Sequence, residues 1–294
     1  MAPEDALATL PCPTWSVAQQ WARQRIDRLD ARLLLQFVTG ASAAELLAFP
    51  ERALDEQQCV FFESLVQRRA MGEPLAYLTG EAGFYGELLQ VSSAVLVPRP
   101  ETEELVTWGL ALLHDCAAPR IADLGTGSGA IALALARARP DAQVLALDVS
   151  QEALSVATAN RDRLNRTNVK MRCASWFEGY PDTPVFDLII SNPPYIDAKA
   201  PHLTGDGVCF EPRLALTDEG GGLSAYATIV VQALPRLKPG GWLLVEHGHD
   251  QADSVAALWR AAGLCDVQSR KDLSGNPRMS VGRKPRVGEV ALGG

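Results

Sequence analysis

Four consecutive residues, Asn192, Pro193, Pro194 and Tyr195, combine hydrogen-bond acceptors with an aromatic ring. They follow FDLII, an apolar run that predicts a buried strand. Asn192 precedes a proline, so its backbone is restricted to extended conformations, and each proline has a fixed φ and no N–H. The segment therefore presents the Asn192 side-chain oxygen and backbone carbonyls beside a flat ring. Such a set suits a planar group with an NH₂, although Asn-Pro is also an ordinary way for a chain to leave a strand.

A second feature is the glycine-rich stretch DLGTGSGA, where a predicted strand meets a predicted helix. Gly125, Gly127 and Gly129 allow a tight turn and a close approach of the backbone to a ligand. Asp148 ends the next predicted strand, where an acid can accept hydrogen bonds from a ribose diol. The same glycine spacing also fits the dinucleotide-binding pattern. Asp123, just upstream of the loop, favours a cationic ligand over a pyrophosphate, because a carboxylate repels phosphates.

The elements that must position these residues are repeated strand–helix units from about residue 95 onward. The predicted strands are RIADLG, AQVLALD, VKMRCAS, FDLIIS, GWLLVEHG and LCDVQSRKD. The predicted helices are SGAIALALARARP, SQEALSVATANRDRLN, GLSAYATIVVQALPRLKPG and DQADSVAALWRAAG. This alternation indicates an α/β fold with a mostly parallel sheet that is covered on both faces. We expect the strand before Asn192 to lie near the strand before Gly125, so that both segments meet at one edge.

The chain is predicted to contain four segments. They are 1–72, a helical domain; 73–94, a linker or hairpin; 95–284, the strand–helix domain; and 285–294, a loose tail. In the helical domain, Ser42 with Glu45 and Asp55 with Gln58 have the spacing of capping boxes. A segment with its own amphipathic pattern, outside the strand–helix alternation, is typical of a separate module.

Composition excludes several classes of protein. Of 294 residues, 47% are hydrophobic and 21% charged, which predicts a folded core. No apolar run approaches the roughly 20 residues that span a bilayer, and no secretory signal is visible. The six cysteines are spaced singly, so we expect a reducing, cytoplasmic setting and no metal site. The net charge of −8 argues against broad contact with nucleic acid.

These motifs together resemble a known family. D-x-G-x-G-x-G followed by N-P-P-Y is similar to class I S-adenosylmethionine methyltransferases that act on amide or exocyclic amino nitrogens. GEPLAYLTGEAGFYG, VLVPRPETEELV, LDVS, SWF, SNPPYI, EPRLALTDEGGGLSAY, LKPGGWLLVEHG and KDLSGNPRMSVGRK, in this order over roughly residues 15 to 284, resemble the peptide chain release factor N5-glutamine methyltransferases. The resemblance implies a Rossmann-like class I methyltransferase with a mostly parallel seven-stranded sheet in 95–284. It also implies a small N-terminal helical domain, for which we expect a role in docking the substrate.

The family's reaction transfers a methyl group from S-adenosylmethionine to the N5 amide nitrogen of the glutamine in the Gly-Gly-Gln motif of class I release factors, which modulates translation termination. The resemblance implies that the cofactor is bound by Gly125, Thr126, Gly127, Ser128, Gly129, Asp148, Trp176 and Asn192. It implies that the substrate is bound by Asn192, Pro193, Pro194 and Tyr195, with Asn192, Pro193 and Tyr195 as the catalytic residues. Ser175 stands where an acid is common in methyltransferases, so adenine recognition is expected to use a backbone carbonyl or Ser175 itself. We expect a monomer that binds neither membrane nor nucleic acid directly.

An amide nitrogen is a poor nucleophile because its lone pair is delocalised into the carbonyl. We expect acceptors at Asn192 and Pro193 to fix the amide hydrogens, with no dedicated base among the side chains. The segment PRPETE, residues 98–103, and the long loop between Ile196 and Leu216 are expected to cover the site. Other readings remain open at this stage: methylation of a ribosomal-protein glutamine or of adenine N6 in DNA, a dinucleotide-dependent oxidoreductase, or a nucleotide sensor.

Overall fold

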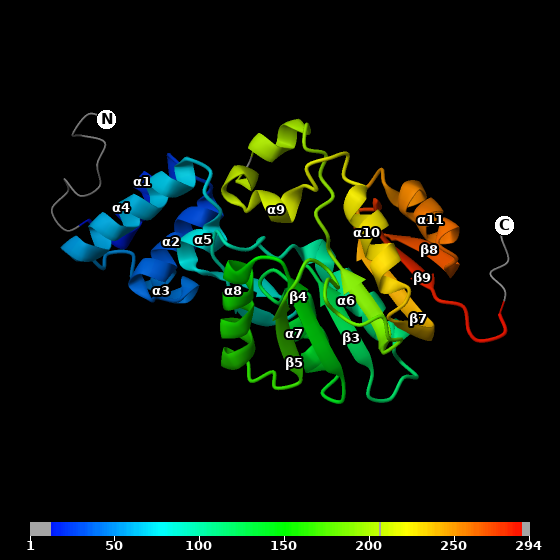
Figure 1. Cartoon of the computed structure of the whole chain (residues 1–294). Coiled ribbons are helices and arrows are strands. Elements are labelled where there is room, and N and C mark those ends of the chain that lie inside the picture. The colour runs from blue at the N-terminus through cyan, green and yellow to red at the C-terminus, as the bar shows by residue number, and fades with distance from the viewer. Residues whose placement is uncertain (1–12, 206, 290–294) are drawn as a thin grey trace. The chain divides into compact units, whose positions relative to one another are not determined.

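The computed structural model describes residues 13–205 and 207–289, and the chain divides into two compact units between Gly80 and Glu81 (Figure 1). The first unit is helical. Its helices are α1 (Trp15–Arg23), α2 (Arg28–Thr39), α3 (Ala43–Ala48), α4 (Glu56–Ala70) and α5 (Leu75–Thr79). Its buried side chains form one separate cluster, which includes Trp15, Leu34, Leu35, Phe62 and Leu65. This unit therefore has a hydrophobic core of its own.

Both predicted capping boxes are confirmed in this unit. The Ser42 hydroxyl accepts from the Glu45 N–H while the Glu45 side chain accepts from the Ser42 N–H. Asp55 and Gln58 make the same reciprocal pair at the start of α4. Each box satisfies backbone N–H groups that the first turn of a helix leaves without partners. Local sequence alone thus fixes where α3 and α4 begin.

The second unit begins with a hairpin of β1 (Glu81–Phe84) and β2 (Glu87–Gln90), followed by a seven-stranded sheet. The strands of the sheet are β3 (Arg120–Leu124), β4 (Gln143–Asp148), β5 (Val169–Cys173), β6 (Phe186–Ser191), β7 (Leu237–Glu246), β8 (Cys265–Lys271) and β9 (Pro277–Arg283). Their order is β5-β4-β3-β6-β7-β9-β8, and only β9 runs antiparallel to its neighbours. The predicted mostly parallel, seven-stranded α/β fold is confirmed, as is the pairing of β3 with β6.

Helices cover both faces of this sheet. They are α6 (Pro100–Leu112), α7 (Ala130–Ala138), α8 (Gln151–Arg163), α10 (Ser224–Ala233) and α11 (Ala252–Ala261), with the short α9 (Arg213–Leu216) in a loop. One core cluster packs α6 and α7 on strand residues such as Ile121 and Leu244. The other packs α10 and α11 on the alternate residues, such as Ala122 and Leu243. Side chains of successive strand residues point to opposite faces, so this alternation decides which helix each residue meets.

In the carboxyl-terminal half, one expectation was wrong and one strand was missed. The helix expected through LKPG ends at Ala233, and Leu237 already belongs to β7, where it is buried and pairs with Phe186. The pairing between β6 and β7 is irregular at this point, which accommodates Pro239, a residue without an N–H for the ladder. The seventh strand, β9, was not among the strands found from periodicity alone.

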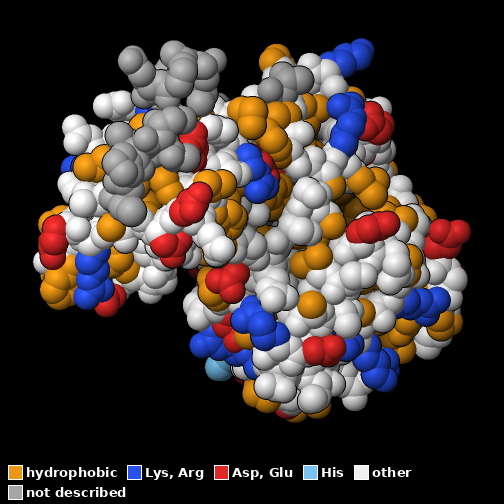
Figure 2. Space-filling model, turned by 90° about the vertical axis from the view of Figure 1, so that its left-hand side faces the viewer, with side chains coloured by type: hydrophobic (Ala, Val, Ile, Leu, Met, Phe, Trp, Pro, Cys, Tyr) orange, Lys and Arg blue, Asp and Glu red, His pale blue; other side chains and the backbone are white. Residues whose placement is uncertain are grey.

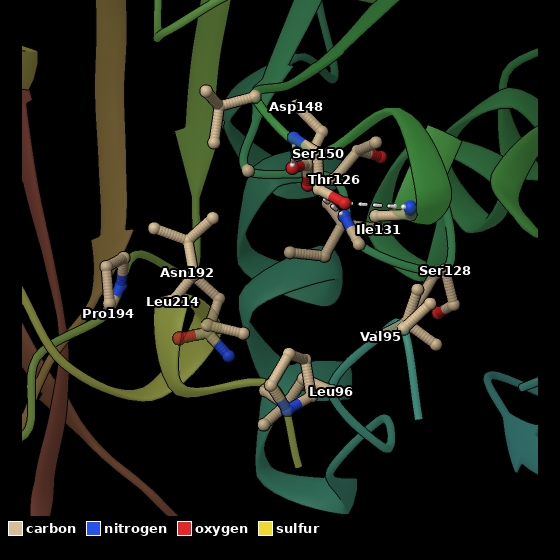
Figure 3. Close-up of a pocket in the computed structure, with 18 of the residues that line it drawn as sticks. Val95, Leu96, Thr126, Ser128, Ile131, Asp148, Ser150, Asn192, Pro194 and Leu214 are labelled. Carbon is tan, nitrogen blue, oxygen red and sulfur yellow. Dashed lines mark hydrogen bonds between the residues drawn. The ribbon is translucent and has the colours of Figure 1, made fainter. Parts of the chain in front are cut away.

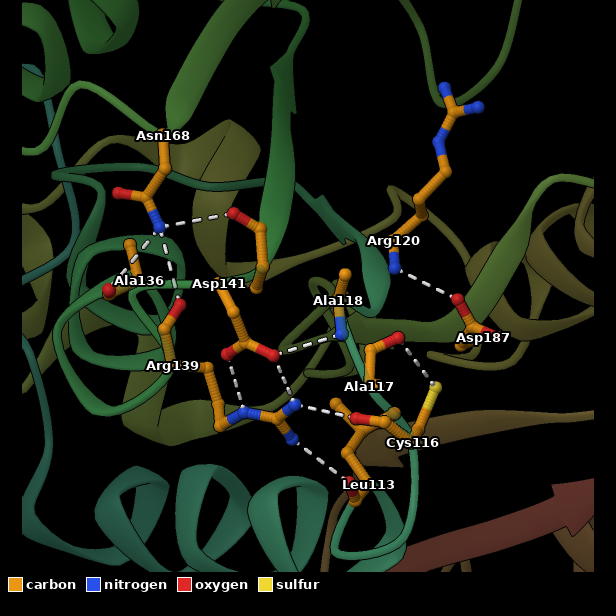
Figure 4. Close-up of polar contacts among 11 residues, drawn as sticks. Leu113, Cys116, Ala117, Ala118, Arg120, Ala136, Arg139, Asp141, Asn168 and Asp187 are labelled. Atoms are coloured by element: carbon orange, nitrogen blue, oxygen red, sulfur yellow. Dashed lines mark hydrogen bonds and ion pairs between the residues drawn. The ribbon is translucent and has the colours of Figure 1, made fainter.

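Polar contacts close the edge of the sheet where the parallel strands begin (Figure 4). The Arg139 guanidinium bonds the Asp141 carboxylate at 2.7–2.8 Å and also donates to the Leu113 and Cys116 carbonyls. This pairing lowers the pKa of Asp141. At the same edge, the Arg120 N–H donates to Asp187. Asp141 and Asp187 are thus paired within the chain, and in sheets of this kind ligands bind at the opposite edge, beyond the carboxyl ends of the strands.

The loop between β6 and α10 contains short helices, although its sequence shows no pattern. They are η3 (Pro201–Thr204), η4 (Val208–Phe210) and α9. Within the described part of the chain, no helix is both long and apolar enough to cross a membrane.

Candidate active site

A cavity of about 340 Å³ lies at the carboxyl ends of β3, β4 and β6, a volume within the usual range for small-molecule sites. Eight of the predicted site residues line it: Gly125, Thr126, Gly127, Ser128, Asp148, Trp176, Asn192 and Pro194. Asp148 and Ser150 lie on one side of the space, and Asn192 and Pro194 lie on the other (Figure 3). Gly129, Pro193 and Tyr195 lie outside its lining. The glycine loop and the NPPY segment, which are far apart in the sequence, thus line one cavity.

The glycine loop needs its glycines for two different reasons. Gly125, Gly127 and Gly129 all have positive φ values, of 70°, 54° and 85°, which side chains disfavour. A Cβ on Gly129 would also lie 3.0 Å from the Leu133 Cδ1, whereas a Cβ on Gly127 would meet nothing within 4 Å. Gly129 therefore serves the packing of α7, while Gly127 leaves open space on the cavity side.

Asp123 stabilises this loop through hydrogen bonds. Its position does not support the expectation that it faces a cationic ligand. Its carboxylate accepts from the Thr126 hydroxyl at 2.7 Å and from the Ala132 N–H at 3.1 Å, and the residue is fully buried outside the cavity lining. Burial raises its pKa to about 7. Asp123 therefore connects the end of β3 to the start of α7 by hydrogen bonds.

Asp148 has the geometry expected of a group that binds a ligand. One carboxylate oxygen accepts from the Gly127 N–H and the other from the Ser150 N–H, each at 2.9 Å. A carboxylate oxygen has two lone pairs, so each retains acceptor capacity for a hydroxyl in the cavity. Burial raises the pKa of Asp148, against these two hydrogen bonds. The side chain is thus held in a fixed orientation at the end of β4.

Trp176 and Ser175 lie beside this acid and line the same cavity. Trp176 has a φ of 51°, the left-handed conformation that a large side chain rarely adopts. Such strain gathers at functional sites, where surrounding contacts maintain it. Its ring lies close to Gly125, with 3.8 Å between the ring and the position of a Cβ there. The arrangement provides a flat apolar wall next to a polar hydroxyl.

Asn192 belongs to a hydrogen-bond chain that enters the sheet. Its Nδ2 donates to the Thr102 Oγ1 at 3.3 Å, and the Thr102 hydroxyl donates to the Glu246 Oε2 at 2.7 Å. The Tyr195 hydroxyl donates to the other oxygen, Glu246 Oε1, at 3.3 Å. Tyr195 thus joins the same hydrogen-bond chain through its hydroxyl, although the residue does not line the cavity. The amide of Asn192 keeps Oδ1 as its acceptor.

The alternation of side chains along β6 and β7 explains why Asn192 and Glu246 both meet Thr102 of α6. Leu244 packs on the α6 side of the sheet, so Glu246, two residues on, projects to the same side. Ile190 packs on that side too, and Asn192 follows it by two residues. Thr102 lies in the first turn of α6, which covers this face. Glu246 was missed from the sequence, where the only indication was an acid that ends an apolar strand.

The segment PRPETE is linked to the loop after β6. Arg99 pairs with Glu211 at 2.5 Å, and the Glu211 carboxylate also accepts from the Val97 N–H. The Glu211 side chain is buried, whereas Arg99 is partly exposed and lines the cavity. Pro212 and Leu214, next to Glu211, line the cavity as well. Both segments that were expected to cover the site therefore contribute to its wall.

The seven-stranded sheet with helices on both faces, the glycine loop and the acid at the end of β4 define a class I methyltransferase. Residues 18–80 match the model of the PrmC N-terminal domain, and residues 109–221 match that of the methyltransferase small domain. The hMettl16 catalytic domain has a similar fold, with a TM-score of 0.54 at 17% identity, covering 82% of this chain and 86% of that one.

Curated relatives give a closer assignment. The release factor glutamine methyltransferase of Bordetella pertussis is 46% identical, over 87% of this chain and 95% of its own length. That of Yersinia pestis is 48% identical, over 90% and 95%. The chain belongs to the release factor glutamine methyltransferase family.

Proposed function

We propose that this protein methylates the N5 amide nitrogen of the glutamine in the Gly-Gly-Gln motif of class I release factors, with S-adenosylmethionine as the methyl donor. The relatives' names supply the substrate class. The observation that carries the proposal is that Asn192 and Asp148 line one cavity, which unites an amide-binding residue with a ribose-binding one. The methylated glutamine would then modulate translation termination.

The residues of the cavity fit this cofactor. Asp148 retains acceptor capacity for the two ribose hydroxyls, and the open space at Gly127 admits a ligand close to the backbone. Trp176 offers a face for adenine, and the Ser175 hydroxyl is the candidate partner of the adenine amino group. When bound, S-adenosylmethionine supplies a methyl group that its sulfonium has already activated.

The chain's own residues act on the glutamine amide. The Asn192 Oδ1 and the Pro193 carbonyl are the acceptors that we assign to the two amide hydrogens, while Pro194 and Tyr195 keep them in place. Fixing both hydrogens aligns the nitrogen and stabilises the positive charge that develops on it. The bound cofactor would supply the methyl group, with sulfur as the leaving atom, to the nitrogen that these residues hold in line, and water would take the extra proton after the transfer. This route uses no dedicated base.

The helical unit is our candidate for recognising the release factor. A pocket sized for one glutamine side chain cannot distinguish between proteins, so selectivity needs contacts away from the reacting nitrogen. Phe37 of α2 and Phe61 of α4 are 44% and 48% exposed, with ring centroids 6.1 Å apart. Figure 2 shows hydrophobic side chains at the surface of one face of the molecule, with charged side chains scattered between them. We also propose a cytoplasmic monomer without direct nucleic-acid contacts; the net charge of −8 supports the last of these three assignments.

Mass spectrometry of a purified class I release factor, after incubation with the protein and the cofactor, tests this function. We expect one added methyl group on the peptide with the Gly-Gly-Gln motif, and none when alanine replaces its glutamine. Parallel reactions with ribosomal proteins and with duplex DNA test the alternative substrates. Methylation of either of those, with the release factor unmodified, would overturn the proposal.

A further inference from the structure

We propose that Glu246 and Thr102 are positioning residues that fix the orientation of the Asn192 amide, so that its oxygen rather than its NH₂ is the group offered to the substrate. This inference rests on the proposed function, because it concerns the same reaction. It assigns roles to two residues on different elements, β7 and α6, neither of which is an acceptor for the substrate amide in the mechanism above.

The argument depends on the single hydrogen of the Thr102 hydroxyl. A carboxylate only accepts, so Glu246 Oε2, 2.7 Å away, requires Thr102 to donate its hydrogen in that direction. The hydroxyl can then only accept from Asn192, whose NH₂ must face it, as the 3.3 Å contact has it. An Asn192 amide turned over would set its oxygen against the lone pairs of Thr102. Ionised Glu246 thus determines the amide orientation through one intervening hydroxyl.

A protonated Glu246 removes this restriction. Its own hydroxyl can donate to Thr102, which is then able to donate to the Asn192 oxygen and to stabilise the reversed amide. The reversed amide presents NH₂ to the NH₂ of the substrate, two donors without an acceptor. Activity should therefore require the ionised carboxylate.

The surroundings place this change in an accessible pH range. Burial raises the pKa of Glu246 to about 7. Hydrogen bonds from Thr102 and Tyr195 and the charge of Arg278 on β9 oppose that shift, while Glu101 at the start of α6 adds to it. The neighbouring His247 is engaged with Ser280 and the Gly248 carbonyl, and burial lowers its pKa. Glu246 is therefore mostly ionised above about pH 7, where it fixes the amide orientation. Below about pH 7 it is mostly protonated, and the reversed Asn192 amide becomes accessible.

The first experiment removes the intervening hydroxyl. Thr102→Val keeps the shape of the side chain, and we expect kcat to fall by about 10- to 100-fold. This is less than the roughly 10²–10³-fold for a contact to the reacting atoms, because Thr102 acts through Asn192. Thr102→Ser restores the hydroxyl and should recover turnover to within about threefold. The affinity for S-adenosylmethionine, measured by titration calorimetry, should stay the same in both. Glu104→Gln, a carboxylate on the same helix whose contact is the Leu273 N–H, is the matched control.

The second experiment uses pH and is independent of the first. The wild-type kcat should decline below about pH 7, and Glu246→Gln should lose this pH dependence because an amide does not titrate. Since the glutamine NH₂ can donate to Thr102 as a protonated carboxyl does, the variant's kcat should stay near the low-pH level of the wild type. Carbon NMR of labelled glutamate, assigned with this variant, reports the titration of Glu246 directly without turnover.

The outcomes separate the two proposals. If the wild-type protein leaves the release factor unmethylated, the proposed function fails. If the wild type is active but Thr102→Val turns over at its rate, the positioning role is overturned. Should that variant not fold, the pH data decide: an unchanged decline in Glu246→Gln overturns the role, and its loss supports it.

Discussion

Asn192 illustrates how a single residue is specified partly by its neighbours in the chain and partly by distant ones. The prolines that follow it restrict its backbone, which the sequence predicts. Which end of its amide faces outward is determined by Thr102, 90 residues away in the chain. Such a partner cannot be identified from periodicity, because the alignment of β6 with α6 is a tertiary feature. The sequence therefore indicated the acceptor, but not what holds it.

Asn192→Ala should abolish most methyl transfer while leaving cofactor binding. The lost contact acts on the substrate amide in the transition state, so we expect kcat to fall by about 10²–10³-fold. Single-turnover assays with release factor measure the rate, and titration calorimetry measures the affinity for the cofactor. Near-normal turnover in the variant would remove Asn192 from the chemistry.

Asp148→Ala should act on cofactor binding instead. A charged hydrogen bond to a ribose hydroxyl contributes roughly 1.5–3 kcal/mol, so the dissociation constant should rise by about 10- to 100-fold. The variant also releases the Gly127 and Ser150 N–H groups, which adds to the loss. Asp253→Ala, an exposed acid on α11, is the control. Unchanged affinity in Asp148→Ala would exclude this acid from the cofactor site.

At the scale of elements, the unit of β3, the glycine loop and α7 shows what local patterns predict well. The strand, the turn and the helix follow from an apolar run, three glycines and an alanine-rich segment. The direction of Asp123 did not follow, because alternation within β3 turns its side chain toward the α7 face with Ile121. The acid beside the loop therefore stabilises the turn rather than facing the cavity.

Asp123→Asn should make stability less sensitive to pH. Folding raises the pKa of this carboxyl from 3.8 to about 7, so the unfolded chain releases the proton first as the pH rises. The stability of the wild type therefore falls between these two values and levels off above the higher one. The amide keeps an acceptor for Thr126 and does not ionise. From pH 5 to pH 8, the variant should gain about 1–3 kcal/mol relative to the wild type.

Urea unfolding at the two pH values measures this difference. Asp253→Asn provides the control for an exposed acid in the same unit. If the gap between Asp123→Asn and the wild type is the same at pH 5 and pH 8, then Asp123 does not titrate in this range.

At the scale of the whole molecule, the chain consists of two compact units, and we propose recognition for the first and chemistry for the second. The helical unit has a core cluster of its own, and the cavity is lined by residues of the second unit alone. Near Gly72 the sequence changes from amphipathic helical segments to a stretch rich in glycine and aromatic residues, which predicted two modules. The two compact units divide at Gly80. The difference is α5, a five-residue helix whose short pattern sits within a glycine- and aromatic-rich stretch. Helices this short have too few turns to show a period.

This separation predicts the effect of removing the helical unit. A chain that begins at Glu81 should still bind S-adenosylmethionine, because all residues of the cavity remain. Its methylation of intact release factor should be slower by at least about 10-fold in kcat/KM, since the remote contacts that we assign to the helical unit are lost. Its activity on a short Gly-Gly-Gln peptide should match that of the full chain, which gains nothing from docking such a substrate.

A surface variant tests the same role without truncation. Replacing Phe37 and Phe61 together by serine removes the exposed aromatic pair of the helical unit, and the KM for release factor should rise while kcat on the peptide stays the same. Val231→Ser, which removes an exposed hydrophobic side chain from α10, is the matched control. Truncated and double-serine proteins that both methylate intact release factor as fast as the full chain would show that recognition lies in the second unit, around the cavity itself.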